Sequence, residues 1–414
     1  MGAISFPIRI ITTALLAFAF CRTVAPAVVT AQVPAVQTRV ASIPLEIAGD
    51  NYLLLKARVN DSEPMTFELD SGGGSGLVLY HRAAELLKVK SAGKGKGGGA
   101  GEATFETSLI KGASLSIGGV TMKNQTFVVF PPDSPPSNLG QTVDGIIGFS
   151  LFNRYVVEID YRSKVVNLYE PSTYQYAGRG ESIGIEILSR VPFARVKVPL
   201  AGRKPIEGRF LVDLGAGRFT LILNTPVVSS NNLLSITKGL IREPGAVGVG
   251  GEVKLFAGRW TAIQLGSFTL NEPVVHFAQD RKGAFASSDF NGLIGGELLR
   301  RFTVIFDYAH KRMILEPNAG FQDHFDYDMS GIRLRAEGAD FKELKVSALV
   351  ENSPAVEAGI REGDLISTID GKLASQITLT EISRMFRQEG KELVLDIIRG
   401  EEKKQIKLKL RRLV

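Results

Sequence analysis

The sequence predicts a mainly β protein with a duplicated body, followed by a separate α+β module. Glycine is abundant, with 44 residues in a chain of 414, and only 22% of the residues are charged. This composition is typical of proteins with many short strands and turns. Two long segments repeat the same landmarks in the same order, which indicates internal duplication. Residues 326–414 do not continue the repeat and alternate between strand and helix patterns.

The repeat is clearest around two aspartates. Asp70 lies within residues 67–79 and Asp213 within residues 210–223, and each aspartate stands between an apolar run and a glycine turn followed by a second apolar run. The later landmarks also correspond in order. They are the glycine-rich segments 97–102 and 248–252 and the apolar segments 143–148 and 290–295. We therefore predict two tandem lobes, lobe 1 at 42–175 and lobe 2 at 180–318.

The first residues predict export from a bacterial cell. Arg9 precedes an apolar run at 10–20, and a stretch of small residues follows, so residues 1–31 have the layout of a signal peptide. The run is shorter than the roughly 20 residues that a transmembrane helix needs, so we expect no stable membrane span after processing. Cleavage beyond Cys21 would leave no cysteine and hence no disulfide. We expect a periplasmic or secreted protein.

The duplicated aspartates predict a specific chemistry. A glycine two residues after each aspartate allows a sharp turn that exposes the carboxylate. A pseudo-twofold arrangement would bring Asp70 and Asp213 together. Two adjacent carboxylates do not both ionise easily, so one would hold a proton while the other activates a water molecule. Such a pair can hydrolyse peptide bonds without a metal or cofactor.

These residues resemble the active-site segments of pepsin-like and retropepsin-like aspartic peptidases. The resemblance rests on Asp70-Ser-Gly and on the apolar-apolar-Gly segments 146–148 and 293–295, and it covers roughly residues 42–318. It implies two acid-protease-like β-barrel lobes, the catalytic residues Asp70 and Asp213, and flaps over a polypeptide substrate. The implied loop-support residues are Ser71, Gly72, Gly73, Leu214, Gly215 and Ala216. The implied flap residues are Gly97, Gly98, Gly99, Gly248, Gly250 and Gly251.

The chain departs from the family pattern at two positions. Gly73 stands where the family has alanine, serine or threonine, and Leu214 stands where it has a hydroxyl residue. The missing hydroxyl favours an asymmetric support of the aspartates. It also leaves open a second function, a non-catalytic protein that binds peptides in the same groove. We favour the active enzyme because both carboxylates are present.

The C-terminal segment resembles a bacterial PDZ domain. The resemblance rests on residues 353–359, Ser-Pro-Ala-Val-Glu-Ala-Gly, and 363–371, Gly-Asp-Leu-Ile-Ser-Thr-Ile-Asp-Gly. PDZ domains add a peptide strand to a sheet edge and capture its terminal carboxylate with backbone amides. The implied capturing residues are Ser330, Gly331 and Ile332, and the implied partner is a peptide or protein C-terminus. A domain that only braces the peptidase is the alternative.

Other functional classes find little support in the sequence. The net charge of +6 is spread along the chain and does not favour nucleic-acid binding. The four histidines are far apart in the sequence, without the paired spacing of a metal site. They are His81, His276, His310 and His324.

Overall fold

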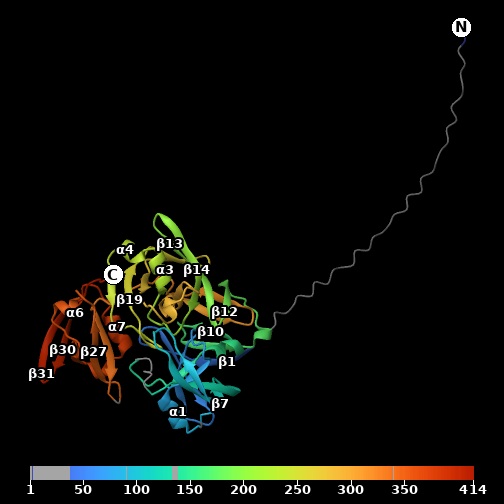
Figure 1. Cartoon of the computed structure of the whole chain (residues 1–414), viewed down its shortest axis with the longest axis horizontal. Coiled ribbons are helices and arrows are strands. Elements are labelled where there is room, and N and C mark those ends of the chain that lie inside the picture. Colours follow the sequence, from blue (N-terminus) through green and yellow to red (C-terminus); the bar gives the residue numbers. More distant parts are fainter. Residues whose placement is uncertain (1, 3–37, 90, 133–138, 339) are drawn as a thin grey trace. The chain divides into compact units, whose positions relative to one another are not determined.

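The computed structural model describes residues 2, 38–89, 91–132, 139–338 and 340–414. The residues from 38 onward belong to one unit, Gln37–Val414. Strands dominate this unit, which confirms the mainly β prediction (Figure 1). The predicted signal peptide, residues 1–31, lies outside the described residues apart from Gly2. Within the described part, no helix is long and apolar enough to cross a membrane.

Lobe 1 is built on an eight-stranded sheet with the order β2-β3-β4-β9-β5-β8-β7-β6. Its inner strands are short and apolar, and β4, β5 and β9 are buried throughout. The strands are β2 (Glu46–Ala48), β3 (Tyr52–Val59), β4 (Met65–Leu69), β5 (Leu77–Leu79), β6 (Lys94–Gly97), β7 (Phe105–Ile117), β8 (Val120–Val129) and β9 (Gly145–Ile147).

Lobe 2 repeats this plan within a larger, fifteen-stranded sheet. Its strands are β12 (Glu181–Leu188), β13 (Val191–Leu200), β14 (Arg203–Val212), β15 (Leu221–Leu223), β16 (Ile241–Glu243), β19 (Leu255–Arg259), β20 (Ala262–Leu265), β21 (Phe268–Asn271), β22 (Val274–Ala278) and β23 (Gly292–Ile294). A separate two-stranded hairpin joins β17 (Val247–Gly248) to β18 (Gly251–Glu252).

Strand pairing confirms the duplication. In lobe 1, β9 pairs parallel with β4 and antiparallel with β5. In lobe 2, β23 pairs parallel with β14 and antiparallel with β15. The strand that precedes each aspartate is therefore paired with the equivalent apolar-apolar-Gly strand in both copies.

The two lobes are joined through one continuous sheet. Strand β10 (Val156–Asp160) of lobe 1 pairs antiparallel with β24 (Phe302–Asp307) of lobe 2. On their outer sides lie β11 (Val165–Tyr169) and β25 (Arg312–Pro317). Beyond β11 the sheet ends at β1 (Arg39–Pro44), and beyond β25 it continues through β12 into the other strands of lobe 2. This arrangement gives the pseudo-twofold relation that brings the two copies together, and one hydrophobic core runs through both lobes.

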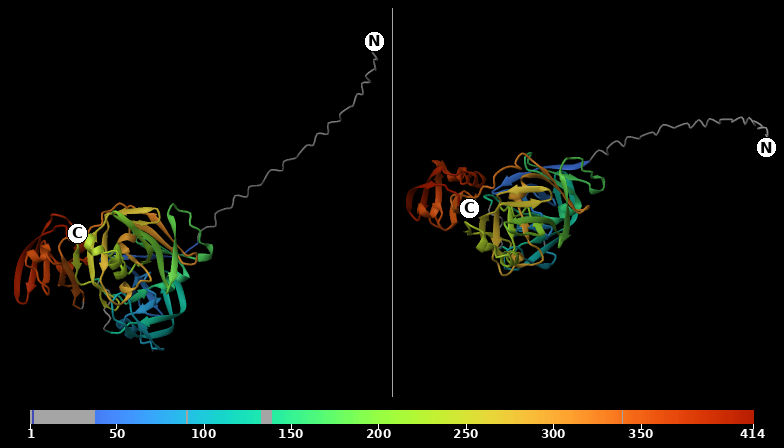
Figure 2. Two further views of the ribbon diagram at one scale, coloured as in Figure 1. Left: turned by 45° about the horizontal axis from the view of Figure 1, so that its top comes forward. Right: turned by 90° about the horizontal axis from the view of Figure 1, so that it is seen from above.

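The C-terminal segment folds as a sheet of its own with a separate hydrophobic core (Figure 2). The main strand order is β26-β27-β28-β30-β31, so β26 is an edge strand. These strands are β26 (Ile332–Glu337), β27 (Glu343–Leu349), β28 (Leu365–Ile369), β29 (Lys372–Leu373), β30 (Glu392–Arg399) and β31 (Glu402–Lys409). Helix α7 (Leu379–Met385) begins at a capping box made by Thr378 and Glu381. The α+β prediction for this segment is confirmed.

The remaining helices are short. They are α1 (His81–Leu87), α2 (Phe149–Arg154), α3 (Thr225–Ser230), α4 (Leu233–Ile236), α5 (Gly296–Leu299) and α6 (Pro354–Glu357), with 3-10 turns at Pro171–Thr173, Ala284–Ala286 and Ala374–Gln376. Helices α2 and α5 directly follow the apolar-apolar-Gly strands of the two copies, which is a further match between the lobes.

Candidate active site

The two predicted catalytic aspartates occupy equivalent positions at the ends of β4 and β14. The backbone N–H of Asp70 donates to the carbonyl of Ile147 at 3.0 Å, and that of Asp213 donates to Ile294 at 2.9 Å. Each aspartate is thus fixed to the buried strand beside it. Both side chains are only partly buried, so the carboxyl groups remain within reach of solvent or a bound substrate.

The two carboxyl groups meet and hydrogen-bond to each other. Oδ1 of Asp70 also accepts the N–H of Gly72 at 2.8 Å and the N–H of Gly215, from the other lobe, at 3.2 Å. Both glycines are needed for this approach. A Cβ at Gly72 would lie 2.6 Å from Oδ1 of Asp213, and one at Gly215 would lie 2.6 Å from Cγ of Asp70.

The electrostatics of the pair favour one shared proton. Burial raises the pKa of Asp213 well above its ordinary value, and the charge of Asp70 and its hydrogen bond raise it further, with a smaller contribution from the buried Glu68. Burial also raises the pKa of Asp70, although hydrogen bonds from Asp213 and nearby backbone N–H groups partly offset this. At a pH where an ordinary aspartate is ionised, the pair therefore retains a proton.

The turns after the two aspartates have the same geometry. The N–H of Gly73 donates to the carbonyl of Asp70 at 3.3 Å, and the N–H of Ala216 donates to that of Asp213 at 3.4 Å. A local steric constraint explains why glycine, and not a larger residue, stands at position 73. A Cβ there would lie 3.2 Å from Oδ2 of Asp70 and 3.1 Å from its carbonyl oxygen, which is tighter than ordinary contact.

One hydroxyl group links the two active-site turns. The fully buried Ser71 donates its Oγ–H to the carbonyl of Val212 at 2.7 Å and accepts the N–H of Leu214 at 3.0 Å. Leu214 is itself fully buried in the core and has no hydroxyl to return this interaction. The asymmetric support that the sequence predicted is therefore present, with lobe 1 supplying the polar side chain.

We expect Ser71→Ala to lower the free energy of unfolding by about 1–3 kcal/mol, because the buried N–H of Leu214 and carbonyl of Val212 lose their partner. Urea denaturation monitored by circular dichroism would measure the change. Ser71→Thr keeps the hydroxyl and is the matched control, with stability expected near that of the wild type. Equal stability of Ser71→Ala and the wild type would contradict the proposed link.

The glycine-rich segments of the two lobes also meet. Gly97 ends β6, with Gly98 and Gly99 after it, while the other three predicted flap glycines lie on the β17–β18 hairpin. A Cβ at Gly99 would lie 2.7 Å from Cβ of Val249, and one at Gly248 would lie 2.6 Å from Cβ of Ala100.

Two backbone hydrogen bonds join these segments. Gly101 N–H donates to Val249 at 2.9 Å, and Ala103 N–H donates to Gly250 at 2.9 Å. The repeat placed the glycines at corresponding positions, but it did not identify Gly101, Ala103 or Val249 as the residues that connect the two segments.

Tyr308 is a neighbour of the aspartates that the sequence analysis missed. Its hydroxyl is buried and has no hydrogen-bond partner among the described residues. Burial raises its pKa, and the charges of Asp70 and Asp213 raise it further, so the phenol lies within electrostatic range of both carboxyls. The repeat contained a signal for this position, because Tyr161 follows Asp160 in lobe 1 as Tyr308 follows Asp307 in lobe 2.

The predicted carboxylate-capturing amides of the C-terminal domain lie together at the start of β26. The N–H groups of Ser330 and Gly331 both donate to Oδ1 of Asp328, at 3.1 and 2.6 Å. The N–H of Ile332 donates to Oγ of Ser330 at 3.0 Å. The three predicted residues thus lie in one loop, in which the amides of Ser330 and Gly331 bind the internal carboxylate of Asp328.

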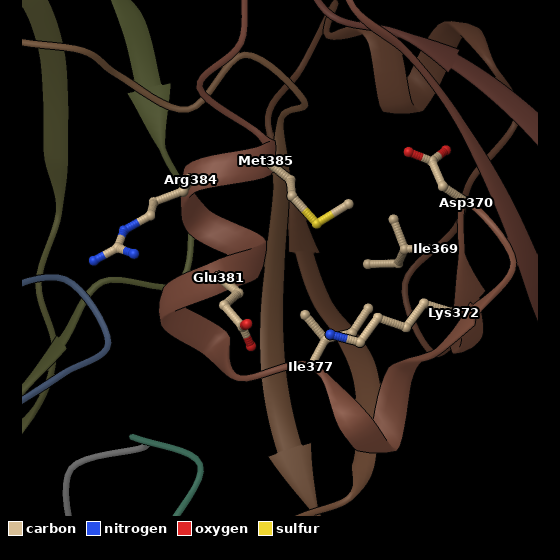
Figure 3. A pocket seen from close by; sticks show the side chains of 7 residues that line it. All are labelled: Ile369, Asp370, Lys372, Ile377, Glu381, Arg384 and Met385. Atoms are coloured by element: carbon tan, nitrogen blue, oxygen red, sulfur yellow. The ribbon is translucent and has the colours of Figure 1, made fainter.

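A separate pocket of about 350 Å³ lies between α7 and the β28–β29 region of this domain (Figure 3). The close-up shows Met385 and Ile369 pointing toward each other across it. Its lining residues are Ile369, Asp370, Lys372, Ile377, Glu381, Arg384 and Met385. This lining contains none of the predicted capturing residues, so the pocket is distinct from the loop that precedes β26.

Comparison with known proteins identifies two segments. The family described as "Aspartyl protease" matches residues 55–151, and the family described as "PDZ domain" matches residues 345–399. The chain therefore carries an aspartyl-protease segment in lobe 1, including Asp70, and a PDZ domain at its C-terminal end. Asp213 lies outside both matched segments.

Two individual proteins are also similar to this chain. A probable CtpA-like serine protease of Staphylococcus haemolyticus (strain JCSC1435) is 30% identical over 98 residues. The match covers 23% of this chain and 20% of that protein, so the chain spans about a fifth of the relative's length. The crystal structure of an aspartic proteinase from Irpex lacteus aligns with a TM-score of 0.46 and 13% identity, over 69% of this chain and 98% of that one.

Proposed function

We propose that this protein, which carries an aspartyl-protease segment and a PDZ domain, is an exported aspartic endopeptidase. Its catalytic pair would be Asp70 and Asp213, and its substrate an extended polypeptide. The observation that supports this best is the hydrogen-bonded pair of carboxyl groups, one from each copy of the repeat. Such a pair, partly open to solvent and sharing a proton, is suited to acid–base hydrolysis of an amide.

In the proposed reaction the ionised member of the pair accepts a proton from a water molecule. The water oxygen then forms a bond to the carbonyl carbon of the scissile peptide, while the protonated member donates its proton to the carbonyl oxygen. Collapse of the resulting tetrahedral diol breaks the carbon–nitrogen bond. The pair donates its proton to the leaving amine and accepts a proton from one diol hydroxyl, so it returns to its starting state with one proton held between Asp70 and Asp213.

The glycine-rich segments would close over the substrate. They are joined by the backbone hydrogen bonds from Gly101 and Ala103, so these bonds would have to open to admit a polypeptide. Val247 and Val249 are among the large apolar side chains that stay exposed. We infer that they contact apolar substrate side chains, because large apolar side chains left exposed near a candidate active site are typical of a binding surface.

Export to the periplasm or the medium is part of the proposal and rests on the sequence of residues 1–31 alone. The layout of a basic residue, a short apolar run and a small-residue stretch is that of a secretory signal peptide. Measuring the N-terminus of the protein recovered from a bacterial periplasm would test it. A chain that begins beyond Cys21 is expected, whereas an intact N-terminus in the cytoplasm would contradict export.

A non-catalytic peptide-binding protein is the second candidate, and Leu214 is the observation that favours it. With no hydroxyl at this position, the side-chain hydroxyl that links the two active-site turns comes from lobe 1, through Ser71. The groove and the carboxyl pair could then bind an extended chain by hydrogen bonds without cleaving it. This candidate predicts retained peptide affinity without turnover.

A digestion assay separates the two candidates. Wild type and Asp70→Asn would be incubated with an unfolded protein from acidic to neutral pH, with fragments followed by mass spectrometry and binding by fluorescence anisotropy. The peptidase proposal predicts fragments with the wild type and binding without fragments with Asp70→Asn. Binding without fragments by the wild type at every pH would instead support the binding protein.

A further inference from the structure

The loop at residues 328–332, here called the carboxylate loop, already contains a carboxylate. Asp328 accepts the N–H of Ser330, the N–H of Gly331 and the hydroxyl of Ser330, the last at 3.0 Å. These are the groups with which a PDZ domain would hold the terminal carboxylate of a peptide. Asp328 therefore stands where that ligand group would bind.

A buried ion-pair network holds Asp328 in this position. Nη1 of Arg333 lies 3.6 Å from Oδ1 of Asp328, and the two side chains are 13% and 18% exposed. Nε of Arg333 also donates to Glu243 of β16 at 2.9 Å, and the Glu243 side chain is only 1% exposed. Displacing Asp328 would thus disturb charges that are paired inside the protein, which is costly without replacement partners.

A peptide strand added to the edge of β26 would lie between β26 and α7, a place here called the β26/α7 groove. The N–H of Met329, before β26, donates to the carbonyl of Phe386, after α7, at 2.8 Å. At the other end of both elements, Ala336 and Leu379 both approach Gly140 of lobe 1. A Cβ at Gly140 would be 4.0 Å from Cβ of Ala336 and 3.3 Å from Cδ1 of Leu379. Strand and helix therefore run antiparallel, and lobe 1 backbone at Gly140 lies against their far ends.

A second segment of lobe 1, the turn between β2 and β3, docks on α7. Thr380 donates its hydroxyl to the carbonyl of Gly49 at 3.2 Å, and Nη2 of Arg387 donates to Oδ1 of Asp50 at 2.8 Å. Ser383 also donates to Asp50. Thr380 and Ser383 share one face of α7, and Arg387 follows just beyond its C-terminal end, so this face of the helix contacts lobe 1.

We propose that the β26/α7 groove of the PDZ domain is an internal docking site occupied by lobe 1, with Asp328 in the place of a ligand's terminal carboxylate. The domain is then closed to a free peptide C-terminus in the resting protein. It acts as a clamp between the lobes.

The segments that contact the PDZ domain also contact the active-site turn of lobe 2. Asn51, next to Asp50, donates to the carbonyl of Gly217 at 3.4 Å. Arg218 forms an ion pair at 3.3 Å with Glu243, which also holds Arg333 of the PDZ domain. Both contacts fall within five residues of Asp213, on the turn that lacks its own hydroxyl. The PDZ domain thereby braces this turn from outside.

Peptide binding by the full chain tests the occupied loop. The probe is a fluorescent ten-residue peptide with an apolar C-terminal residue and a free carboxylate, compared with the same peptide carrying a C-terminal amide. We expect no saturable binding outside the catalytic groove by Asp213→Asn protein. Asp213→Asn/Asp328→Ala/Arg387→Ala should bind the free-carboxylate peptide at least tenfold more tightly than the amide. Asp213→Asn/Asp328→Asn/Arg387→Ala, which keeps an oxygen acceptor in the loop, should not.

Equally tight, carboxylate-dependent binding by all three proteins would overturn the proposal. So would a correctly folded Asp213→Asn/Asp328→Ala/Arg387→Ala protein that binds the free-carboxylate peptide no more tightly than Asp213→Asn does. If that variant fails to fold, hydrogen exchange of the wild type tests whether the carboxylate loop and α7 are already occupied. The amides of 329–332 and 379–387 should be protected without ligand and unchanged by added peptide. Fast exchange that slows on adding peptide would overturn the proposal.

The brace is tested by hydrogen exchange at residues 213–219. We expect Arg387→Ala, which removes an ion pair to Asp50, to speed exchange there several-fold. Arg361→Ala removes an exposed arginine of the same domain and should leave this segment unchanged. Equal exchange in the two variants would contradict the brace. Neither measurement needs catalytic activity, so failure of this proposal is distinguishable from failure of the peptidase proposal.

Discussion

The Asp213→Asn variant is expected to lose at least about 10³-fold in kcat/KM for peptide cleavage, because the pair loses one of its two proton-transfer groups. The same variant should be more stable than the wild type near neutral pH. The pKa of Asp213 is raised in the folded protein. Its contribution to stability is therefore fully present below the ordinary carboxyl pKa and is lost as the pH rises through the raised pKa. Asparagine carries no charge and avoids this loss.

Cleavage rates and thermal unfolding at acidic and neutral pH would measure both effects. The gain in melting temperature should be present at neutral pH and disappear in acid. Asp289→Asn removes an exposed carboxyl of the same lobe and should change neither property. A variant that cleaves at the wild-type rate, or that is less stable than the wild type at neutral pH, would show that Asp213 has another role.

The Gly72→Ala variant should fold but lose at least about 10²-fold in kcat. The new methyl group pushes the carboxyl group of Asp213 out of its position for catalysis. The Cβ would stand 2.6 Å from Oδ1 and 2.7 Å from Cγ of Asp213. Gly215→Ala should act in the same way on Asp70, with its Cβ at 2.7 Å from Oδ1. Either variant would force the two carboxyl groups apart.

Gly184→Ala is the matched control for these substitutions. Gly184 lies on β12, and a Cβ there meets nothing within 4 Å. It should keep wild-type kcat. Crystal structures of the Gly72 and Gly215 variants would show whether the carboxyl hydrogen bond is lost. Wild-type turnover by Gly72→Ala would mean that the close approach of the two turns is dispensable for cleavage.

Much of the fold followed from the repeat. An aspartate after an apolar run, a glycine turn, and an apolar-apolar-Gly segment recur in both copies, and this order predicted two equivalent lobes. The structure adds the matching pairings of β4 with β9 and β14 with β23. The absent hydroxyl at Leu214 was equally visible in the sequence, because the copies could be compared position by position. The structure adds that Ser71 hydrogen-bonds to both Val212 and Leu214 of the other lobe.

The sequence could not predict contacts between segments that lie far apart along the chain. The contact of Gly101 with Val249 needs the approach of two lobes, which no local pattern encodes. Asp328 filling the loop before β26 depends on one backbone turn and on a charge network that includes Glu243. A short polar stretch of sequence gives no sign of such a role. The predicted domain bounds and the catalytic roles remain predictions.

The pH dependence of peptide cleavage by the wild type tests most directly whether Asp70 and Asp213 act as one proton-sharing pair. The initial rate of the digestion should pass through a maximum and fall as the pair loses its shared proton. Because burial and the neighbouring charge raise the pKa of Asp213, this fall should lie at a higher pH than the titration of an ordinary aspartate. A rate that instead rises from acidic through neutral to alkaline pH would contradict a carboxyl pair and indicate a different nucleophile.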